Sequence, residues 1–294
     1  MEEKLKHLNN LFEKCSLLSE NDFPVLQKPF LKWVGGKTQI IKDILQKFPI
    51  EIENYHEVFL GGGSVLLALL SLQKAGKIQI KNKIYASDIN ETLIYLFKNI
   101  QNHKEELFTF LQQYIQEYES CTGTLINRKP KTKEEGLTSK ESYYYWLRNE
   151  FNQMDKQSVE CSALFLFLNK TCFRGVYREG PHGFNVPFGH YKKTPTFLSK
   201  EEFEHLYELI KDVEFTCCNF EDSFSKMQEG DFVYLDPPYA PQKSDSFVSY
   251  TKDGFNIEKH QTLFKKVCQL HQERIKFLMS NAKVELVLQN FKDY

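Results

Sequence analysis

The sequence carries almost no net charge, since 38 Lys and Arg residues are balanced by 39 Asp and Glu residues, which leaves −1. A strongly basic chain would by itself indicate a nucleic-acid partner, so any polyanion must be bound here by a local patch. Long apolar runs are missing too. The longest, from Val58 to Leu72, is interrupted by Gly61-Gly62-Gly63-Ser64 and is too short to cross a bilayer. We therefore expect no membrane partner.

Cysteine usage gives no sign of a disulfide framework or of a bound metal. The seven cysteines are odd in number and none forms a C-x-x-C pair, which excludes the spacing of a zinc ribbon. The segment 1–15 is charged and amphipathic, without the apolar core and cleavage site of a secretory signal. We expect a protein of the reducing bacterial cytoplasm that binds no metal.

The composition and the order of apolar runs favour a folded α/β protein. Hydrophobic residues make up 41% and charged residues 26% of 294 residues, which corresponds to about two domains or to one large domain with an insertion. Strand-like runs alternate with helical periodicity, which predicts a mostly parallel, Rossmann-like sheet with helices on both faces. The expected strands are 56–60, 83–87, 213–218, 232–235 and 275–280, and the expected helices are 65–72, 91–118 (one or two) and 257–271.

Residues 121–194 interrupt this alternation and predict an inserted, mainly helical domain. A polar, lysine-rich loop at 127–140 is followed by helical patterns around 143–151 and 161–169, and then by a segment rich in Gly, Pro and aromatics that we interpret as a β-hairpin. The predicted division is a helical N-terminal extension at 1–28, one discontinuous domain at 29–120 and 195–294, and the insertion at 121–194.

Two expected strands end in groups that suit a nucleoside. The run from Glu57 to Ser64 (E-V-F-L-G-G-G-S) leads into a glycine turn that lets a ligand approach the backbone, although an ordinary strand–helix turn would read the same. The dinucleotide fingerprint fails, because Leu66 stands three residues after Gly63. Asp88 ends the next expected strand. In nucleotide-binding α/β sheets an acid at this position accepts hydrogen bonds from ribose hydroxyls; the alternative is that Asp88 is the N-cap of the following helix.

The segment from Phe30 to Thr38 (F-L-K-W-V-G-G-K-T) resembles a P-loop only superficially, because Leu31 stands where that motif needs glycine. We do not expect an NTPase. A lysine and an aromatic ring beside a glycine turn can instead contact a carboxylate and an adenine or sulfonium face.

The run Asp231 to Tyr239 (D-F-V-Y-L-D-P-P-Y) is the most specific signal. An apolar strand delivers Asp236, two prolines and a tyrosine at its carboxyl end, where open α/β sheets bind ligands. A carboxylate and a free main-chain carbonyl form two acceptors for one amino group, and the ring of Tyr239 offers a stacking surface. The alternative is a proline-rich turn with no function.

Together D-P-P-Y at 236–239, F-x-G-x-G at 59–63 and F-L-K-W-x-G-G-K at 30–37 resemble the DNA adenine-N6 methyltransferases of the Dam type, in which these motifs have the same order around a target-recognition insertion. Further similarity at 86–90, 168–170 and 184–193 extends the resemblance over about residues 29–281. It implies a methyltransferase sheet and the cofactor S-adenosylmethionine, which leaves as S-adenosylhomocysteine. It also implies adenine methylation in double-stranded DNA, most often in GATC, and pairing with a restriction endonuclease. The family usually adds further strands, whereas this chain ends at Tyr294, so we expect a C-terminally shortened sheet.

The resemblance also implies roles for individual residues. The target adenine is flipped out of the helix and stacks on Tyr239, while Asp236 and the Pro237 carbonyl accept its N–H bonds, and Arg178 matches a guanine-reading arginine. The catalytic set is Asp236, Pro237, Pro238 and Tyr239; the cofactor set is Trp33, Gly36, Lys37, Phe59, Gly61, Gly63, Ser64, Asp88, Ile89 and Asp236; the DNA set is Lys170, Phe173, Arg174, Tyr177, Arg178, Asn185, Pro187, Lys192 and Lys193.

Local charge agrees with a DNA partner. Residues 170–193 hold five Lys and Arg against one carboxylate, a net charge of +4, with aromatic residues interleaved. This pattern suits phosphate neutralisation and insertion at a base step, whereas the alternative is a solvated hairpin with core aromatics. Other functions stay open: an adenine methyltransferase for another DNA sequence or for RNA, a catalytically inactive DNA-binding homologue and, less favoured, a glutamine or protein methyltransferase, since those usually carry Asn in place of Asp236.

Overall fold

A parallel sheet forms the centre of the computed structural model, which describes residues 18, 23–240 and 255–292. Its five strands have the order β7-β4-β2-β8-β9, which confirms the predicted α/β class. Most of the helical N-terminal extension predicted at 1–28 lies outside the described residues. The strands are β2 (Tyr55–Glu57), β4 (Ile84–Asp88), β7 (Val213–Cys217), β8 (Phe232–Leu235) and β9 (Lys276–Met279). Two small two-stranded sheets pair β1 (Glu51–Ile52) with β3 (Gln79–Ile80) and β5 (Glu179–Gly180) with β6 (Gly183–Phe184).

The strand order creates a switch point between β2 and β8. The chain adds β4 and then β7 on one side of β2, and later adds β8 and β9 on the other side. All neighbouring strands of this sheet are parallel, so the loops that leave β2 and β8 emerge at the same edge. In open α/β sheets ligands bind in the crevice at such a point.

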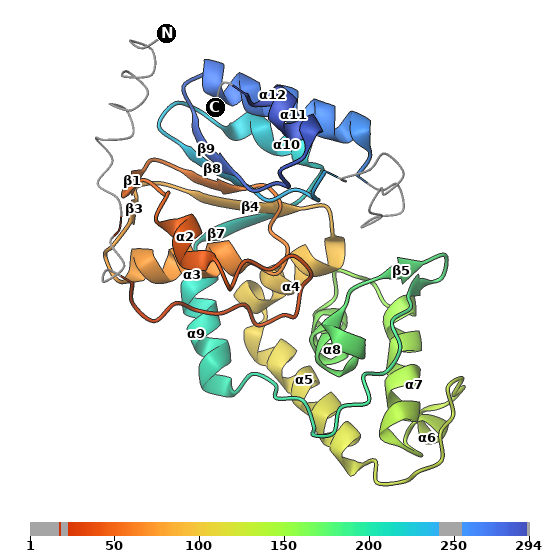
Figure 1. The fold of residues 1–294 in the computed structure, drawn as a ribbon. Coiled ribbons are helices and arrows are strands. Elements are labelled where there is room, and N and C mark those ends of the chain that lie inside the picture. The colour runs from red at the N-terminus through yellow and green to blue at the C-terminus, as the bar shows by residue number, and fades with distance from the viewer. Residues whose placement is uncertain (1–17, 19–22, 241–254, 293–294) are drawn as a thin grey trace.

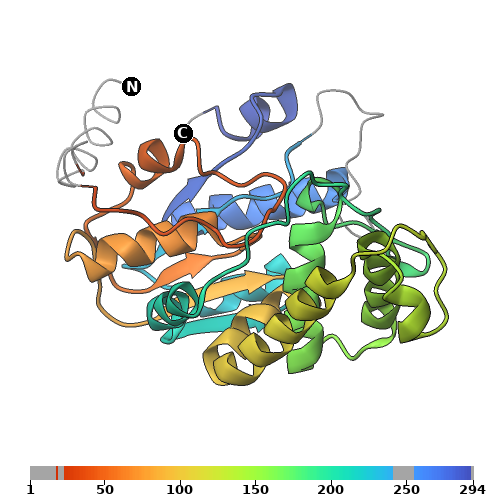
Figure 2. The same ribbon diagram turned by 90° about the horizontal axis from the view of Figure 1, so that it is seen from below.

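Helices cover both faces of the sheet (Figures 1 and 2). The alternation along β8 explains this, since Phe232 and Tyr234 join the larger core on one face while Val233 and Leu235 join a second core on the other. The larger core lies under α2 (Ile41–Leu45), α3 (Ser64–Lys74), α4 (Glu91–Asn102) and α9 (Lys200–Ile210); the second lies under α10 (Phe220–Ser223), α11 (Ile257–Gln272) and α12 (Glu285–Asn290). No helix in the described part of the chain has the length and apolar composition that a bilayer crossing needs.

The predicted insertion consists mainly of helices beside the sheet (Figure 1). Its helix α8 (Val159–Thr171) is buried over almost its whole length because it packs against α4, α5 and α7, so its apolar residues belong to the same continuous core as those under the sheet. A short 3₁₀ turn at Phe173–Gly175 and the hairpin β5–β6 follow α8. The other helices of residues 121–194 are α6 (Lys133–Gly136) and α7 (Lys140–Gln153), whereas α5 (Lys104–Ser120) precedes the predicted insertion.

Candidate active site

An ion pair joins two of the sequence motifs at the carboxyl ends of the strands. Asp236 directly follows β8, and its Oδ2 lies 2.5 Å from Nζ of the buried Lys37. Lys37 Nζ also donates to the Gly35 carbonyl at 2.7 Å, and its main-chain N–H donates to Ser64 Oγ at 3.2 Å. These bonds hold the lysine at the start of α3, beside the switch point.

The second oxygen of Asp236 is unused. Its Oδ1 is buried and has no hydrogen-bond partner among the described residues. Burial raises the pKa of Asp236, whereas the hydrogen bond and positive charge of Lys37 act in the opposite direction. Lys37 therefore supports the ionised form, which offers an acceptor at Oδ1.

The residues after Asp236 add a ring beside this pair. Pro237 is buried and Pro238 is half-buried, while Tyr239 is 40% exposed. The centroid of its ring lies 5.1 Å from Lys37 Nζ. The motif thus combines a half-buried carboxylate, whose Oδ1 is buried, with an accessible aromatic face, which is the geometry that stacking of a planar group requires.

A glycine turn leads from β2 to α3 under the indole of Trp33. Gly61 has φ +50° and Gly63 has φ +70°, a left-handed conformation that favours glycine. A Cβ atom at Gly62 would lie 2.8 Å from Trp33 Cβ, so the tryptophan approaches the turn as closely as glycine permits. The segment that carries Lys37 and the turn after β2 therefore lie against each other at the switch point.

Asp88 lies at the end of β4 and braces the same turn. Its Oδ2 accepts the Gly61 N–H at 2.9 Å and its Oδ1 accepts the Asn90 N–H at 2.9 Å. Burial raises the pKa of Asp88, and these main-chain donors counteract the rise. The cap of α4 is Asn90, which accepts from Leu93 N–H, so the helix-cap alternative for Asp88 is wrong.

The other predicted cofactor residues surround the turn less tightly. Ile89 is 53% exposed beside Asp88, and Gly36 is exposed near Trp33. Phe59 is half-buried and stacks on Phe220 with ring centroids 5.7 Å apart.

Glu57 is a buried carboxyl group in this region that sequence reasoning did not single out. It ends β2, is 2% exposed and accepts a hydrogen bond from Tyr55 Oη at 2.7 Å. Burial raises the pKa of Glu57 to about 8, and the charge of Asp236 adds to the rise. Its position in an apolar strand run gave the only signal, because an acid there must be buried on one face or the other.

The segment that carries Lys32 and Trp33 is bonded directly to the predicted DNA-reading segment. Buried Asn169 accepts the Lys32 N–H at 2.9 Å, donates to the Lys32 carbonyl at 2.8 Å and donates to the Gly175 carbonyl at 3.2 Å. The ring of Tyr177 stacks on Trp33 with centroids 5.5 Å apart and an interplanar angle of 26°. Trp33 thus touches the glycine turn on one side and Tyr177 on the other.

The predicted DNA residues around the 3₁₀ turn and the hairpin are mostly exposed. Phe173 is 45% exposed, and the centroid of its ring lies 5.1 Å from the guanidinium of Arg174. Arg174 has φ +56°, a conformation that is uncommon for a residue with a side chain. Arg178 Nε donates to Asn185 Oδ1 at 2.8 Å across the hairpin. Exposed Pro187 accepts the Phe173 N–H through its carbonyl at 2.8 Å.

The remaining members of the basic segment fall into two groups. Lys192 and Lys193 are exposed, whereas Lys170 is partly buried at the end of α8, and burial together with the charge of Lys32 lowers the pKa of Lys170. Phe184 and Phe188 are buried, so for these two aromatics the core alternative is correct. The segment therefore exposes some of its interleaved cations and rings and uses the others for packing.

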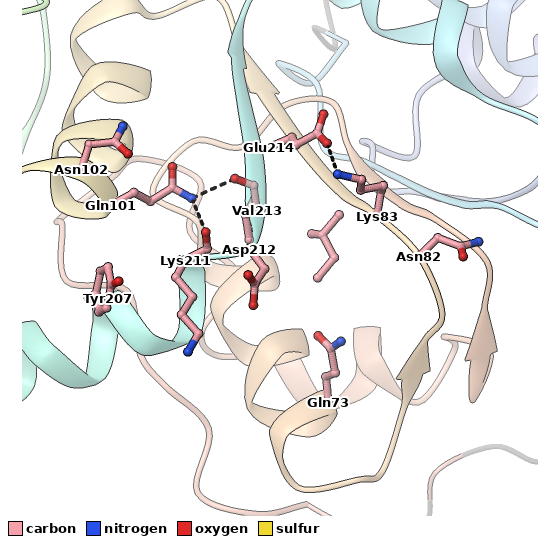
Figure 3. A pocket seen from close by; sticks show the side chains of 11 residues that line it. Gln73, Asn82, Lys83, Gln101, Asn102, Tyr207, Lys211, Asp212, Val213 and Glu214 are labelled. Atoms are coloured by element: carbon pink, nitrogen blue, oxygen red, sulfur yellow. Dashed lines mark hydrogen bonds and ion pairs between the residues drawn. The ribbon is translucent and has the colours of Figure 1, made fainter.

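A polar depression of about 740 Å³ lies at the opposite edge of the sheet (Figure 3). It is lined by Lys83 and Glu214, which form an ion pair at 2.8 Å, and by Gln101, whose amide donates to main-chain carbonyls of Ile210 and Val213. These residues lie near the amino ends of β4 and β7, and their polar groups have partners within the protein. The residues that line this depression do not include Asp236, which lies at the carboxyl end of β8.

Comparison with known proteins identifies the class of enzyme to which the chain belongs. The chain belongs to the D12 class of N6 adenine-specific DNA methyltransferases, whose profile matches residues 33–294. It is 37% identical over 87% of its length to the type II methyltransferase M.MjaIII of Methanocaldococcus jannaschii, of which it covers 84%. It is 30% identical over 86% of its length to the DNA adenine methylase of Escherichia coli K12, covering 80% of that protein, and 30% identical over 95% to the type II methyltransferase M1.LlaDCHI of Lactococcus lactis subsp. cremoris, covering 89%.

The predicted resemblance and activity are therefore confirmed: the protein is an adenine-specific DNA methyltransferase. Membership of this family implies S-adenosylmethionine as the methyl donor and DNA as the substrate. The roles of individual residues, the recognition sequence and the division into domains stay predictions.

Proposed function

We propose that the crevice between β2 and β8 binds S-adenosylmethionine against the glycine turn and the target adenine against Asp236 and Tyr239. The observation that carries this proposal is Asp236 itself, with one oxygen on Lys37 and the other buried without a partner. A buried acceptor of this kind is costly unless a ligand uses it. The amino group of adenine is a donor of the required kind.

The residues around the turn suit the cofactor. Asp88 would accept hydrogen bonds from the ribose hydroxyls, as acids at the end of a second strand do. Main-chain N–H groups at the start of α3 would donate to it, beside the glycine turn on which Trp33 packs. Gly36, Phe59 and Ile89 would border it. When bound, the cofactor supplies a methyl group carried on a positively charged sulfur.

The chemical step follows from the poor basicity of the adenine amino group, whose lone pair is delocalised into the ring. Asp236 Oδ1 and the Pro237 carbonyl would accept the two N–H bonds and return the lone pair to nitrogen. This would orient the nitrogen toward the methyl group that the bound cofactor supplies, and the proton that the nitrogen gives up would pass along its hydrogen bond to Asp236 Oδ1 and from there to solvent. Pro238 fixes the backbone after Pro237, and Tyr239 holds the base by stacking. Orientation and electrostatics account for the acceleration.

A base inside a duplex cannot reach a buried carboxylate, so we propose that the target adenine is flipped out of the helix. Phe173 and Arg174 protrude beside Tyr177 in the segment that would face the duplex. Exposed Lys192 and Lys193 would contact phosphates, as would Lys170 after a side-chain movement.

For the recognition sequence we propose GATC, read in part by Arg178. Its bond to Asn185 engages Nε and not the two terminal nitrogens, which are the pair that bridges guanine O6 and N7. Two relatives carry the name type II methyltransferase. On that basis we propose that this enzyme acts in the bacterial cytoplasm and protects DNA from a cognate restriction endonuclease.

The test is methylation of a mixed-sequence duplex DNA library with labelled S-adenosylmethionine, followed by sequencing that reports N6-methyladenine. We expect methylation at the adenine of GATC. Methylation confined to another sequence would contradict the GATC proposal and leave the chemistry intact. Label that appears in cytosine, or only in RNA or protein, would contradict the placement of adenine at Asp236.

A further inference from the structure

Two buried polar atoms without partners lie at the ends of neighbouring strands, and one is an acceptor while the other is a donor. In the described part of the chain such atoms are Asp236 Oδ1, Asn281 Nδ2 and His260 Nδ1. His260 belongs to α11, where its ring packs edge-on against Phe255. Asp236 and Asn281 instead belong to the segments that leave β8 and β9.

The backbone holds these two segments together. The register pairs Leu235 with Met279, and the Ser280 N–H donates to the Leu235 carbonyl at 2.8 Å. Asp236 and Asn281 therefore emerge at the same edge of adjacent parallel strands. The side chain of Asn281 is also tied to the D-P-P-Y segment, because its Oδ1 accepts the Ala240 N–H at 3.1 Å.

The orientation of the Asn281 amide follows from its partners. Oδ1 accepts main-chain N–H groups from both Ala240 and Ala282, the second at 2.8 Å. An NH₂ group in that position would face two donors, so the oxygen must occupy it. The unused group of Asn281 is consequently a donor.

We propose that Asn281 Nδ2 donates a hydrogen bond to the ring nitrogen beside the amino group of the target adenine, N1 or N7, while Asp236 Oδ1 accepts from that amino group. This inference rests on the proposed placement of adenine at Asp236. Adenine presents a donor beside an acceptor on either edge of its amino group, which is the complement of an acceptor beside a donor. Guanine presents O6, an acceptor, where adenine has its amino donor. Guanine would therefore leave Asp236 unpaired, so the pair of side chains selects adenine over guanine.

Adenine analogues test the contact with unaltered protein. The target adenine of the preferred duplex is replaced by 7-deazaadenine or by 1-deazaadenine, in which a C–H group stands in place of one ring nitrogen. We expect kcat/KM to fall by about 10- to 100-fold for one of the two analogues, the cost of an unpaired buried donor. Equal rates on adenine and on both analogues would overturn the proposal.

The variant Asn281→Asp identifies the residue responsible. It keeps an oxygen for Ala240 and Ala282 and replaces the donor by an acceptor. We expect a similar loss on adenine and little further loss on the sensitive analogue, because the contact is already missing. If the fall in kcat/KM for Asn281→Asp on the sensitive analogue equals the product of the two separate falls, the analogue effect belongs to another group. That result would overturn the role of Asn281.

Two controls separate this result from other failures. Asn290→Asp adds the same charge at an exposed position of α12 and should retain the wild-type preference. Affinity for S-adenosylhomocysteine and the thermal unfolding midpoint report whether Asn281→Asp is folded; if it is not, the analogue comparison with wild type decides. Wild-type protein that methylates no adenine would refute the proposed function itself, an outcome distinct from insensitivity to the analogues.

Discussion

Replacing Glu57 by glutamine should stabilise the protein by an amount that grows with pH. Glu57 has an ordinary pKa of 4.5, and burial raises the pKa to about 8 in the folded protein. Between these values the folded state keeps a proton that the unfolded chain has lost, so the stability of the wild type falls as pH rises through this range. At about 1.4 kcal/mol per pKa unit, the wild type should lose roughly 3 kcal/mol between pH 5 and pH 8 from this group. The amide of glutamine does not titrate in this pH range, and its carbonyl oxygen can still accept the hydrogen bond of Tyr55 Oη.

Urea unfolding of both proteins at pH 5, 6, 7 and 8 measures the effect, because all other titrating groups are shared. We expect the free energy of unfolding of Glu57→Gln minus that of the wild type to increase by roughly 3 kcal/mol over this range. Glu119→Gln, the same change of residue type at an exposed position of α5, is the control. A difference for Glu57→Gln that does not change with pH would mean that Glu57 is ionised in the folded protein and would refute the reasoning.

Three further predictions concern the proposed site. Asp236→Ala should lower the methylation rate on the order of 10²–10⁴-fold, because one amino acceptor is lost; a variant with more than a tenth of the wild-type rate would contradict this role. Lys37→Ala and Asp88→Ala should weaken binding of S-adenosylhomocysteine in calorimetry and change DNA affinity little, and unchanged cofactor affinity in both would remove them from that site. Arg178→Ala should cost about 1–3 kcal/mol on GATC and relax discrimination at its first base. Lys192→Ala should weaken all duplexes alike and reduce the salt slope by about one unit; a uniform loss for Arg178→Ala would make it a phosphate contact.

Strand β8 has the predicted bounds because it is a short apolar run that ends in a polar group. Strand β2 spans Tyr55–Glu57, whereas a strand at 56–60 was predicted. The helix pattern from 91 to 118 predicted one or two helices, and the chain breaks at His103, which ends α4 and begins α5. Helix α9 was missed although Ser199 and Glu202 form a capping box, a signal that was present in the sequence. Strands β1 and β3 have two residues each, which is too short for any periodicity.

The candidate site could be predicted as a set of motifs but not as a set of contacts. Lys37 and Asp236 were both singled out, yet their ion pair joins residues 199 positions apart in the sequence, a distance over which local patterns carry no information. Composition also could not decide which aromatics of the basic segment face inward, so exposed Phe173 and buried Phe184 looked equivalent. The unpaired donor of Asn281 depends on the fold of two strand ends and has no local signature.

The stack of Trp33 on Tyr177 and the bonds of Asn169 have a thermodynamic consequence. Since one indole contacts both the glycine turn and Tyr177, a ligand that fixed this ring on the proposed cofactor side would lower the entropy that binding on the proposed DNA side must lose. Coupling free energies are reciprocal, so whatever factor S-adenosylhomocysteine contributes to DNA affinity, DNA must contribute to the affinity for S-adenosylhomocysteine. An enzyme built in this way would discriminate between sequences partly through how tightly it retains its methyl donor.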